Sequence, residues 1–474
     1  MKLRVAPLLL IPFVSNAAIQ GVVSSPDGCW RELAVSPVRA MSGELLDLDA
    51  AKSAQTVTGF GCAMSELSHQ ALWQLPAAER AKALDGLFGA DGAGFTVIRT
   101  PIGASDFALK YYSYDDHPGD FAMEKFSIAN DEKTLLPLLR EVQKRVSAEE
   151  LKIWASPWCP PKWLKKTDRY ASQKPWPDMA ENGVLNDCTD AERVYEGENG
   201  FIVDEAHLKA YGLYFRKYVD AYRAAGVPIF MVMPQNEPNS AQPYPSCTWR
   251  NAALVKFIGK YLGPALEGSG VEIFFGTEER GTAEFALNAL EDADAAKYVK
   301  GAGFQWAGRW ALVGVHKRHP ELTVYATESE CGTGKNDWAE AEHTWELIKH
   351  YFDHGCSVYE YWNLALQADC MSTWGWKQNS LVIVDPAAPG GWRYSPDFYV
   401  MQHLSKYVKR GAKFLPLGEK KDAIAFRNPD GSTVLLAHNG GKTPKVLRFK
   451  AGGALYAVQL APGALATLKS SPIL

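Results

Sequence analysis

The middle of the chain alternates short apolar runs with longer stretches in which apolar residues recur every three or four positions. Such apolar runs are typical of strands in a parallel sheet, and the longer stretches are typical of the helices that connect them. Some runs, such as Ile-Phe-Met-Val-Met at 229–233, are apolar at consecutive positions, as in strands covered on both faces. We predict eight strands, at residues 56–64, 95–102, 152–158, 229–234, 271–276, 301–306, 322–327 and 357–364.

Two of the intervening stretches have one clear apolar face at helical spacing. In residues 204–225 this face comprises Leu208, Tyr211, Phe215, Tyr218, Val219 and Tyr222. Asp204 is suited to cap the start of this helix and Gly226 to end it. A second helix is expected over 337–354. Eight units of strand and helix predict an α/β fold, a (β/α)8 TIM barrel over residues 56–407, in which right-handed crossovers bring all the strands' carboxyl ends to one face.

The pattern changes after residue 407. Short apolar runs follow one another there, at 423–427, 433–438, 447–449, 454–459 and 464–468. The first two flank Asn-Pro-Asp-Gly, which is a turn sequence. Residues 408–474 are therefore expected to form an antiparallel β module, which is small enough that we expect it to pack on the barrel. Residues 30–55 are expected to add N-terminal strands to this module.

The first 18 residues have the features of a secretory signal peptide. Lys2 and Arg4 precede an apolar run at 6–14, and small residues follow at 15–17. The alternative for this segment is a buried N-terminal strand. We expect residues 1–18 to be a signal peptide and the protein to be secreted or periplasmic. No membrane span is expected, because no later stretch reaches 18 consecutive apolar residues.

Charge and composition narrow the class of partner. The 474 residues carry a formal net charge of −4 and contain no long basic run, which argues against nucleic acid. The 15 Trp residues are a surplus, and 20 Tyr and 20 Phe accompany them. Flat aromatic faces suit a large core and also the C–H faces of sugar rings, so composition alone leaves both interpretations open.

Cysteine and histidine spacing gives no support for a metal or another cofactor. The eight cysteines include no Cys-x-x-Cys pair, which argues against a zinc ribbon or a thioredoxin-type motif. In an exported protein some of them could form disulfides, and the sequence does not assign pairs. His343, His350 and His354 share a helical spacing that could face a cation, but no carboxylate or cysteine completes the set at convincing spacing. We expect no metal and no cofactor.

Carboxylates that follow the predicted strands are the candidates for chemistry, because the carboxyl ends of barrel strands form the active-site face. Glu237 follows strand four within Asn-Glu-Pro, and Glu328 follows strand seven. Glycosidic bond cleavage needs two such groups: one donates a proton to the leaving oxygen, and the other attacks the sugar or activates water. Asn236 could offer its amide to a sugar hydroxyl. Strand alternation puts Glu330 on the same side as Glu328 and does not choose between them.

Other acidic residues at strand ends have different expected roles. Asp106 follows strand two and is a candidate substrate contact. We expect Glu278 and Glu279 to form an ion-pair cluster with Arg280 at the mouth of the barrel. Glu360, between two tyrosines, is expected to be a structural, hydrogen-bonded partner.

Seven blocks of sequence follow one another in this order: Gly-Phe-Gly-Cys-Ala-Met at 59–64, Arg-Thr-Pro-Ile-Gly-Ala-Ser-Asp-Phe at 99–107, Ala-Ser-Pro-Trp-Cys-Pro-Pro-Lys-Trp-Leu at 155–164, Asn-Glu-Pro at 236–238, Asp-Ala-Asp-Ala-Ala-Lys-Tyr-Val at 292–299, Ala-Thr-Glu at 326–328 and Tyr-Trp-Asn-Leu at 361–364. Together they resemble glycoside hydrolase family 30, which includes the lysosomal glucosylceramidases and microbial β-1,6-glucanases.

The resemblance implies a fold and a set of site residues. The family combines the barrel with a flanking β-sandwich built from both chain ends, and it retains anomeric configuration. Its acid/base falls on Glu237 and its nucleophile on Glu328, not on Glu330. With Trp306 at the end of strand six, the expected substrate contacts are Asp106, Trp158, Asn236, Trp306 and Trp362.

Departures from the family pattern bear on the substrate. The glucosylceramidase-like members carry His-Trp-Tyr at the end of strand six, where this chain has Gln-Trp-Ala-Gly at 305–308. Residues 372–381 and 328–332 look more like the β-1,6-glucanase branch. The resemblance therefore implies a retaining hydrolase of β-linked glucan, above all β-1,6-glucan. With the signal peptide expected at 1–18, we expect a secreted enzyme, and we expect it to be a monomer.

Two groups of alternatives accompany this prediction. Within the family, the alternatives are glucosylceramidase, β-glucosidase and β-xylosidase activities. From another class, the alternative is a non-catalytic carbohydrate-binding protein on the same scaffold. Such a binder has no need for both Glu237 and Glu328 at facing strand ends.

Overall fold

Eight parallel strands close into a barrel in a computed structural model that describes residues 19–39, 43–181, 183–419 and 421–472. The strands are β5 (Gly59–Ala63), β6 (Val97–Pro101), β7 (Lys152–Ser156), β8 (Met231–Val232), β9 (Glu272–Glu278), β10 (Val299–Gln305), β11 (Thr323–Glu328) and β12 (Cys356–Tyr361). Every neighbouring pair is parallel, and β12 pairs with β5 to close the ring. The predicted (β/α)8 barrel is confirmed, and each of the eight predicted strands overlaps one observed strand. The predicted signal peptide at 1–18 lies outside the described residues.

Strand β8 is the one that differs most from its predicted length. It spans Met231–Val232, within the expected 229–234. The N–H groups of Phe230 and Met233 still donate to β7, at 2.8 and 2.9 Å, so the chain follows the sheet on both sides of the assigned strand. Pro234 has no N–H to offer the next position of the ladder, and the chain turns there into the segment that carries Glu237.

Helices surround the barrel. They are α1 (Glu66–Trp73), α2 (Ala77–Phe88), α3 (Leu135–Gln143), α4 (Pro177–Glu181), α5 (Glu205–Ala224), α6 (Asn251–Phe257), a π-turn (Ile258–Leu262), α7 (Gly263–Leu266), α8 (Glu284–Glu291), α9 (Gly308–Arg318), α10 (Trp338–Asp353) and α11 (Pro396–Ser405), with single 3-10 turns at Asp131–Lys133, Lys162–Leu164, Asp190–Glu192 and Pro389–Gly391. The carboxylate of Asp204 caps α5, and that of Asp337 caps α10. Gly226 follows α5 with a φ of +82°, a conformation that glycine adopts without strain.

A β-sandwich flanks the barrel and is built from both chain ends. Its first sheet has the order β16 (Lys413–Leu415), β17 (Ala423–Arg427), β18 (Thr433–His438), β21 (Leu465–Ser470), β1 (Ile19–Ser25) and β2 (Gly28–Glu32). Its second sheet has the order β3 (Pro37–Val38), β20 (Ala454–Leu460), β19 (Lys445–Ala451) and β4 (Leu46–Asp47). The expected sandwich is confirmed, but β1 begins at Ile19, ahead of the expected start at residue 30. Its interior is an apolar cluster that includes Leu435 and Leu468 from one sheet and Phe449 and Val458 from the other.

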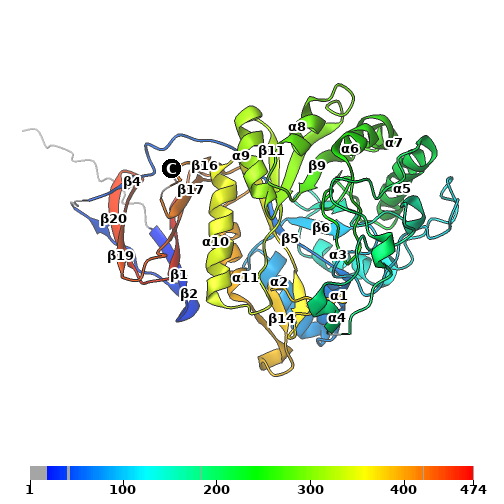
Figure 1. Cartoon of the computed structure of the whole chain (residues 1–474). Helices are drawn as coiled ribbons and strands as arrows, with labels where there is room; N and C mark the ends of the chain where they lie inside the picture. Colours follow the sequence, from blue (N-terminus) through cyan, green and yellow to red (C-terminus); the bar gives the residue numbers. More distant parts are fainter. Residues whose placement is uncertain (1–18, 40–42, 182, 420, 473–474) are drawn as a thin grey trace, which may run out of the picture.

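Figure 1 shows the sandwich at one end of the molecule, with α10 and α11 between it and the barrel. His403 of α11 joins the two parts, because its Nδ1 lies 2.9 Å from Thr467 Oγ1 on β21 and its Nε2 lies 2.9 Å from Ser24 Oγ on β1. A third sheet of β13 (Ala365–Gln367), β14 (Val382–Val384) and β15 (Trp392–Tyr394) lies after the barrel in sequence. None of the helices in the described part of the chain is long and apolar enough to cross a membrane.

All eight cysteines are free thiols in the structure, so the disulfides that export would permit are not formed between described residues. The three histidines with helical spacing also have other partners. His343 contacts Glu330, while His350 and His354 contact the backbone carbonyls of Arg309 and His350. Across the described residues, no group of three or more His, Cys, Asp or Glu is arranged to hold a metal ion.

Candidate active site

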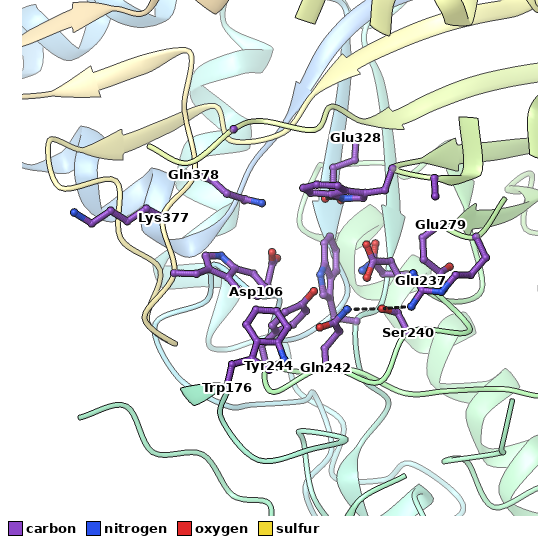
Figure 2. Close-up of a pocket in the computed structure, with 17 residues that line it drawn as sticks. Asp106, Trp176, Glu237, Ser240, Gln242, Tyr244, Glu279, Glu328, Lys377 and Gln378 are labelled. Carbon is purple, nitrogen blue, oxygen red and sulfur yellow. Dashed lines mark hydrogen bonds and ion pairs between the residues drawn. The ribbon is translucent and has the colours of Figure 1, made fainter. Parts of the chain in front are cut away.

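A pocket of about 430 Å³ lies at the carboxyl ends of the barrel strands and contains the predicted acidic pair. Glu328 is the last residue of β11, and Glu237 lies in the turn after β8. Figure 2 shows both side chains among the residues that line this pocket. The loops that follow the strands supply the rest of the lining, so two residues that are distant in sequence share one cavity.

A single amide nitrogen contacts both carboxyl groups. Gln305 Nε2 donates to Glu237 Oε1 at 3.2 Å and to Glu328 Oε2 at 3.1 Å. The separation of these two oxygens therefore cannot exceed the sum of the two distances. Glu237 has a backbone φ of +49°, a conformation that is uncommon for residues other than glycine and that tends to cluster at functional sites.

Glu328 accepts hydrogen bonds from three different side chains. Arg99 Nη1 lies 2.9 Å from Oε2, and Trp306 Nε1 lies 2.9 Å from Oε1. Gln305 is the third donor. Arg99 is fully buried and its Nη2 also donates to Asn236 Oδ1 at 2.6 Å, so one guanidinium links the carboxylate to the amide beside Glu237.

The surroundings of the two carboxyl groups differ in charge. Burial raises the pKa of both groups, because a charged carboxylate loses water. Arg99 acts most strongly against this rise for Glu328, whose pKa is still raised to about 7, whereas the hydrogen bond from Gln305, followed by the charge of Arg280, acts against it for Glu237. Since close like charges disfavour ionisation of both, the arrangement favours one protonated and one ionised carboxyl group, and the direct ion pair with Arg99 stabilises the charged form of Glu328.

Asp106 is a third acidic residue in the same pocket. Burial, followed by repulsion from Glu328 and Glu237, raises its pKa well above the usual value. Its Oδ1 is buried and has no hydrogen-bond partner within the described protein. A buried polar atom of this kind is costly unless a partner such as a ligand hydroxyl reaches it.

The structure brings most of the predicted substrate contacts to the pocket. Asp106, Trp158, Asn236 and Trp306 line it together with the two glutamates. Trp362 does not line the cavity. It lies behind Trp158, with ring centroids 5.3 Å apart and planes at 28°.

The remaining acidic candidates lie in different environments. The Glu330 side chain lies outside the pocket, where it forms an ion pair with Arg309 and a 3.0 Å contact with His343. Because Glu330 is engaged outside the cavity, the structure separates it from Glu328, which strand alternation did not. Glu360 accepts a 2.6 Å hydrogen bond from Trp154 Nε1, and burial raises its pKa to about 8, in keeping with the expected structural role.

The expected ion-pair cluster at strand five is only partly formed. Arg280 pairs with Glu196 and lies 4.0 Å from Glu279, but Glu278 accepts instead from the backbone N–H of Arg280. Burial raises the pKa of Glu278 to about 8 and that of Glu279 well above its usual value. Glu279 also lines the pocket, which the sequence interpretation did not foresee.

Several lining or supporting residues were not identified as functional from the sequence. Arg99 carried a signal, since it is the one charged residue inside strand β6. The only signal for Gln305 was that it departs from the family pattern at the end of strand six. Trp376, Lys377 and Gln378 lie within residues 372–381, which resembled the β-1,6-glucanase branch but were assigned no role. The others come from loops and had no distinct signal; they are Trp176, Ser240, Gln242 and Tyr244.

Comparison with known proteins agrees with this geometry. The model of the glycosyl hydrolase family 30 TIM-barrel domain matches residues 57–408, and that of the family 30 beta sandwich domain matches residues 417–468. The chain belongs to glycoside hydrolase family 30. It is therefore a glycoside hydrolase that acts on carbohydrate substrates.

Family 30 relatives differ in the activities their names carry. The chain is 28% identical to lysosomal acid glucosylceramidase of Mus musculus over 448 residues, which cover 88% of this chain and 82% of that protein. It is also 28% identical to an endo-1,6-beta-D-glucanase of Neurospora crassa over 477 residues, which cover 91% of each chain. The crystal structure of SrfJ from Salmonella typhimurium has the same fold, with a TM-score of 0.81 at 22% identity over 95% of this chain and 99% of that one.

Proposed function

We propose that this family 30 enzyme is a retaining hydrolase of β-1,6-linked glucan, with Glu328 as nucleophile and Glu237 as acid/base. The observation that carries the mechanism is the Gln305 amide, which lies 3.2 Å from Glu237 and 3.1 Å from Glu328. The sum of these distances is the upper limit for the separation of the two oxygens that share the amide, and it lies just below the about 6.5–9.5 Å between the carboxyl groups of inverting enzymes. This supports the closer spacing of about 5–5.5 Å that lets one carboxylate attack the sugar directly.

The contacts of the two glutamates match the proposed roles. Glu328, ionised beside Arg99, attacks the anomeric carbon while Glu237 gives its proton to the departing oxygen. A covalent glycosyl-enzyme forms on Glu328. Glu237, now ionised, takes a proton from water, and the resulting attack releases the sugar with its configuration retained. A protein that only binds carbohydrate would need no such pair.

The pocket lining favours a glycan over a glycolipid as substrate. Among the described residues that line it, no aliphatic side chain is larger than that of Ala307. The alkyl chains of ceramide would therefore find apolar surface only on the aromatic rings of the lining. Trp176, Trp376 and Tyr244 instead offer aromatic faces, which suit sugar rings. The Neurospora crassa relative, named an endo-1,6-beta-D-glucanase, supports the same choice.

We also propose that the enzyme is exported and acts outside the cytoplasm. The basis is the pattern of residues 1–18, in which a basic start, an apolar run and small residues follow one another. A polymeric glucan is a substrate that an exported enzyme would meet directly. N-terminal sequencing of the protein recovered from culture medium or periplasm, with a new terminus near residue 19, is the expected result. Recovery of an intact N-terminus from the cytoplasm alone would contradict export.

A substrate panel tests the proposed activity. Purified enzyme is incubated with β-1,6-glucan, β-1,3-glucan, glucuronoxylan, an aryl β-glucoside and glucosylceramide, with the Glu328→Gln protein as the matched control. We expect the fastest hydrolysis on β-1,6-glucan, with the β-anomer as the first product seen by NMR. Release of the α-anomer would exclude the retaining mechanism. Preference for xylan or glucosylceramide would contradict the proposed substrate but not the proposed mechanism.

A further inference from the structure

The end of strand β9 is tied to the turn that carries Glu237. The backbone N–H of Glu237 donates to the carbonyl of Thr277 at 3.2 Å, and that of Asn239 donates to Glu279 Oε1 at 3.1 Å. Glu237 keeps its uncommon backbone conformation between these two contacts. Because the turn and the strand end are held together, a side chain that follows β9 has a fixed place relative to Glu237.

Arg280 is such a side chain, and its guanidinium reaches the same turn. Its Nη2 donates to Ser240 Oγ at 3.4 Å, and Gln242 Nε2 donates to the same oxygen (Figure 2). A hydroxyl oxygen has two acceptor positions and one proton of its own. Since both acceptor positions of Ser240 are occupied, its proton is left to donate, and the hydrogen bond from Ser240 acts to lower the pKa of Glu237. Arg280 thus orients the hydroxyl that faces the proposed acid/base.

The charge of Arg280 also acts on Glu237. Burial raises the pKa of Glu237, and the hydrogen bond from Gln305 opposes this rise most strongly. The charge of Arg280 comes next, ahead of that of Arg99, while Lys377 lies across the pocket in Figure 2. The other titratable groups around Glu237 are acids; they are Asp106, Tyr244, Glu279 and Glu328. Arg280 therefore offsets, on the side of Glu237, part of the repulsion that ionised acids exert there.

A retaining reaction needs both protonation states of its acid/base. Glu237 must be protonated in the first step and ionised in the second. Burial and the surrounding acids favour the protonated form, so the ionised form depends on a nearby cation. The Glu196 carboxylate that pairs with Arg280 is 49% exposed, so water screens its charge more than it screens the buried Glu237.

We propose that Arg280 is a positioning residue that, together with Ser240, stabilises the ionised Glu237 that activates water in the second step. This inference rests on the proposed function, because it takes Glu237 as the acid/base. It gives the charged cluster at the end of β9 a role in the reaction cycle. Arg280 then serves Glu237 as Arg99 serves Glu328.

The pH dependence of two aryl substrates tests this role. In Arg280→Met the pKa of Glu237 should rise, so the basic limb of kcat/KM on 4-nitrophenyl β-glucoside, for which Glu237 must be protonated, should move upward by at least about 0.5 in pH. With 2,4-dinitrophenyl β-glucoside the leaving group needs no proton, and the second step limits kcat. That step needs an ionised Glu237, so the acidic limb of kcat should move upward as well. Arg280→Lys keeps the charge and should restore both limbs in part.

Arg318→Met is the matched control. Arg318 also pairs with an exposed glutamate, Glu291, but it lies on α9 outside the pocket, so both limbs should stay in place. Ser240→Ala removes the oriented hydroxyl and keeps the charge, and should move both limbs upward by less than Arg280→Met does. A loss of rate in Arg280→Met with neither limb moved would overturn the inference, because a purely structural role lowers the rate at every pH. Circular dichroism of each variant confirms that it is folded.

Glu237→Gln keeps the two proposals separate. Without a titrating group at this position, the basic limb on 4-nitrophenyl β-glucoside should vanish. A basic limb that persists unchanged in Glu237→Gln would overturn the proposed acid/base. A basic limb that vanishes in Glu237→Gln but stays in place in Arg280→Met would overturn only the role of Arg280.

Discussion

Arg99 and Glu328 form a buried ion pair at the base of the pocket, with Nη1 2.9 Å from Oε2. Both side chains come from barrel strands, so neither position depends on a loop. The guanidinium also lies over the Trp158 ring, 4.4 Å from its centroid, which fixes its plane. A carboxylate buried here without a cation would be neutral. Arg99 is thus the residue that makes an ionised nucleophile possible in the proposed mechanism.

Replacing Arg99 should move the acidic limb of the pH–rate profile. In Arg99→Met the positive charge is lost, the pKa of Glu328 rises, and the nucleophile ionises only at higher pH. We expect the acidic limb of kcat/KM on an aryl β-glucoside to shift upward, with at least a tenfold loss of rate at neutral pH. Arg99→Lys keeps the charge and should shift the limb less. An acidic limb that stays in place in Arg99→Met would show that another group controls it.

Replacing Gln305 should shift the basic limb of the pH–rate profile. The hydrogen bond from Gln305 lowers the pKa of Glu237, so Gln305→Leu should raise that pKa and keep the proton donor active to higher pH. We expect the basic limb of kcat/KM to move upward, while the maximum rate falls because the two carboxyl groups are less well positioned. Gln367→Leu, on β13 outside the pocket, is the matched control. A downward shift of the basic limb in Gln305→Leu would contradict this role.

The two glutamates should respond differently to the leaving group. Glu237→Gln removes the proton donor, so its rate loss should be about 10²–10⁴-fold with poor leaving groups and much smaller with 2,4-dinitrophenol. Glu328→Gln removes the nucleophile and should be inactive with both. Glu330→Gln, which changes an acidic residue that contacts Arg309 and His343, should retain most activity. An inactive Glu330→Gln beside an active Glu328→Gln would reverse the assignment.

His403 should make the junction between barrel and sandwich sensitive to acid. Burial lowers its pKa to about 3, so the folded state holds it neutral. The stability that it contributes is fully present above the unfolded-state pKa of about 6.5 and is lost as pH falls toward 3. In His403→Gln this loss does not occur. We expect a variant destabilised by about 1–3 kcal/mol at pH 7.5, from its weaker fit to Ser24 and Thr467, and a smaller difference at pH 4.5.

Thermal unfolding of both proteins at the two pH values measures this difference. Phe398→Leu, on the same helix α11, is a suitable control because it changes packing without changing a titratable group. A difference in stability between wild type and His403→Gln that grows as the pH falls would contradict the prediction.

Seven of the eight cysteines should react as buried thiols, and Cys29, which is only partly buried, should react faster. All eight are free, and burial raises the pKa of Cys159 and Cys356 to about 12, which suppresses their thiolates. We expect slow alkylation of the native protein and eight alkylated cysteines after unfolding without a reductant. Mass spectrometry of the two samples makes the comparison. Fewer than eight alkylated sites in the unfolded, unreduced protein would reveal disulfides.

Local patterns in the sequence were enough to predict the barrel. Apolar runs of strand length and helices with one apolar face report which backbone segments must be covered, and this depends on near neighbours along the chain. Strand β8 is short although hydrogen bonds to its neighbours resume at Gln235 and Asn236, beyond Pro234, which has no N–H to donate. Strand β1 was missed because it directly follows an apolar segment interpreted as a signal peptide. The predicted strand ends also identified Glu237 and Glu328 as candidate catalytic residues, since every parallel strand in a barrel ends at the same face.

By itself, the sequence determined the class of fold, the family and the acidic residues that end strands four and seven, because each is encoded in short stretches of chain. Only the tertiary structure decided how those residues are held. Arg99 meets Glu328 across 229 positions of sequence, and Gln305 bridges two strands to reach both carboxyl groups. The tertiary structure also directs Glu330 to Arg309, away from Glu328, and stacks the ring of Trp176 on that of Trp376. Closure of the barrel and the paths of its loops set these contacts, and no spacing along the chain encodes them.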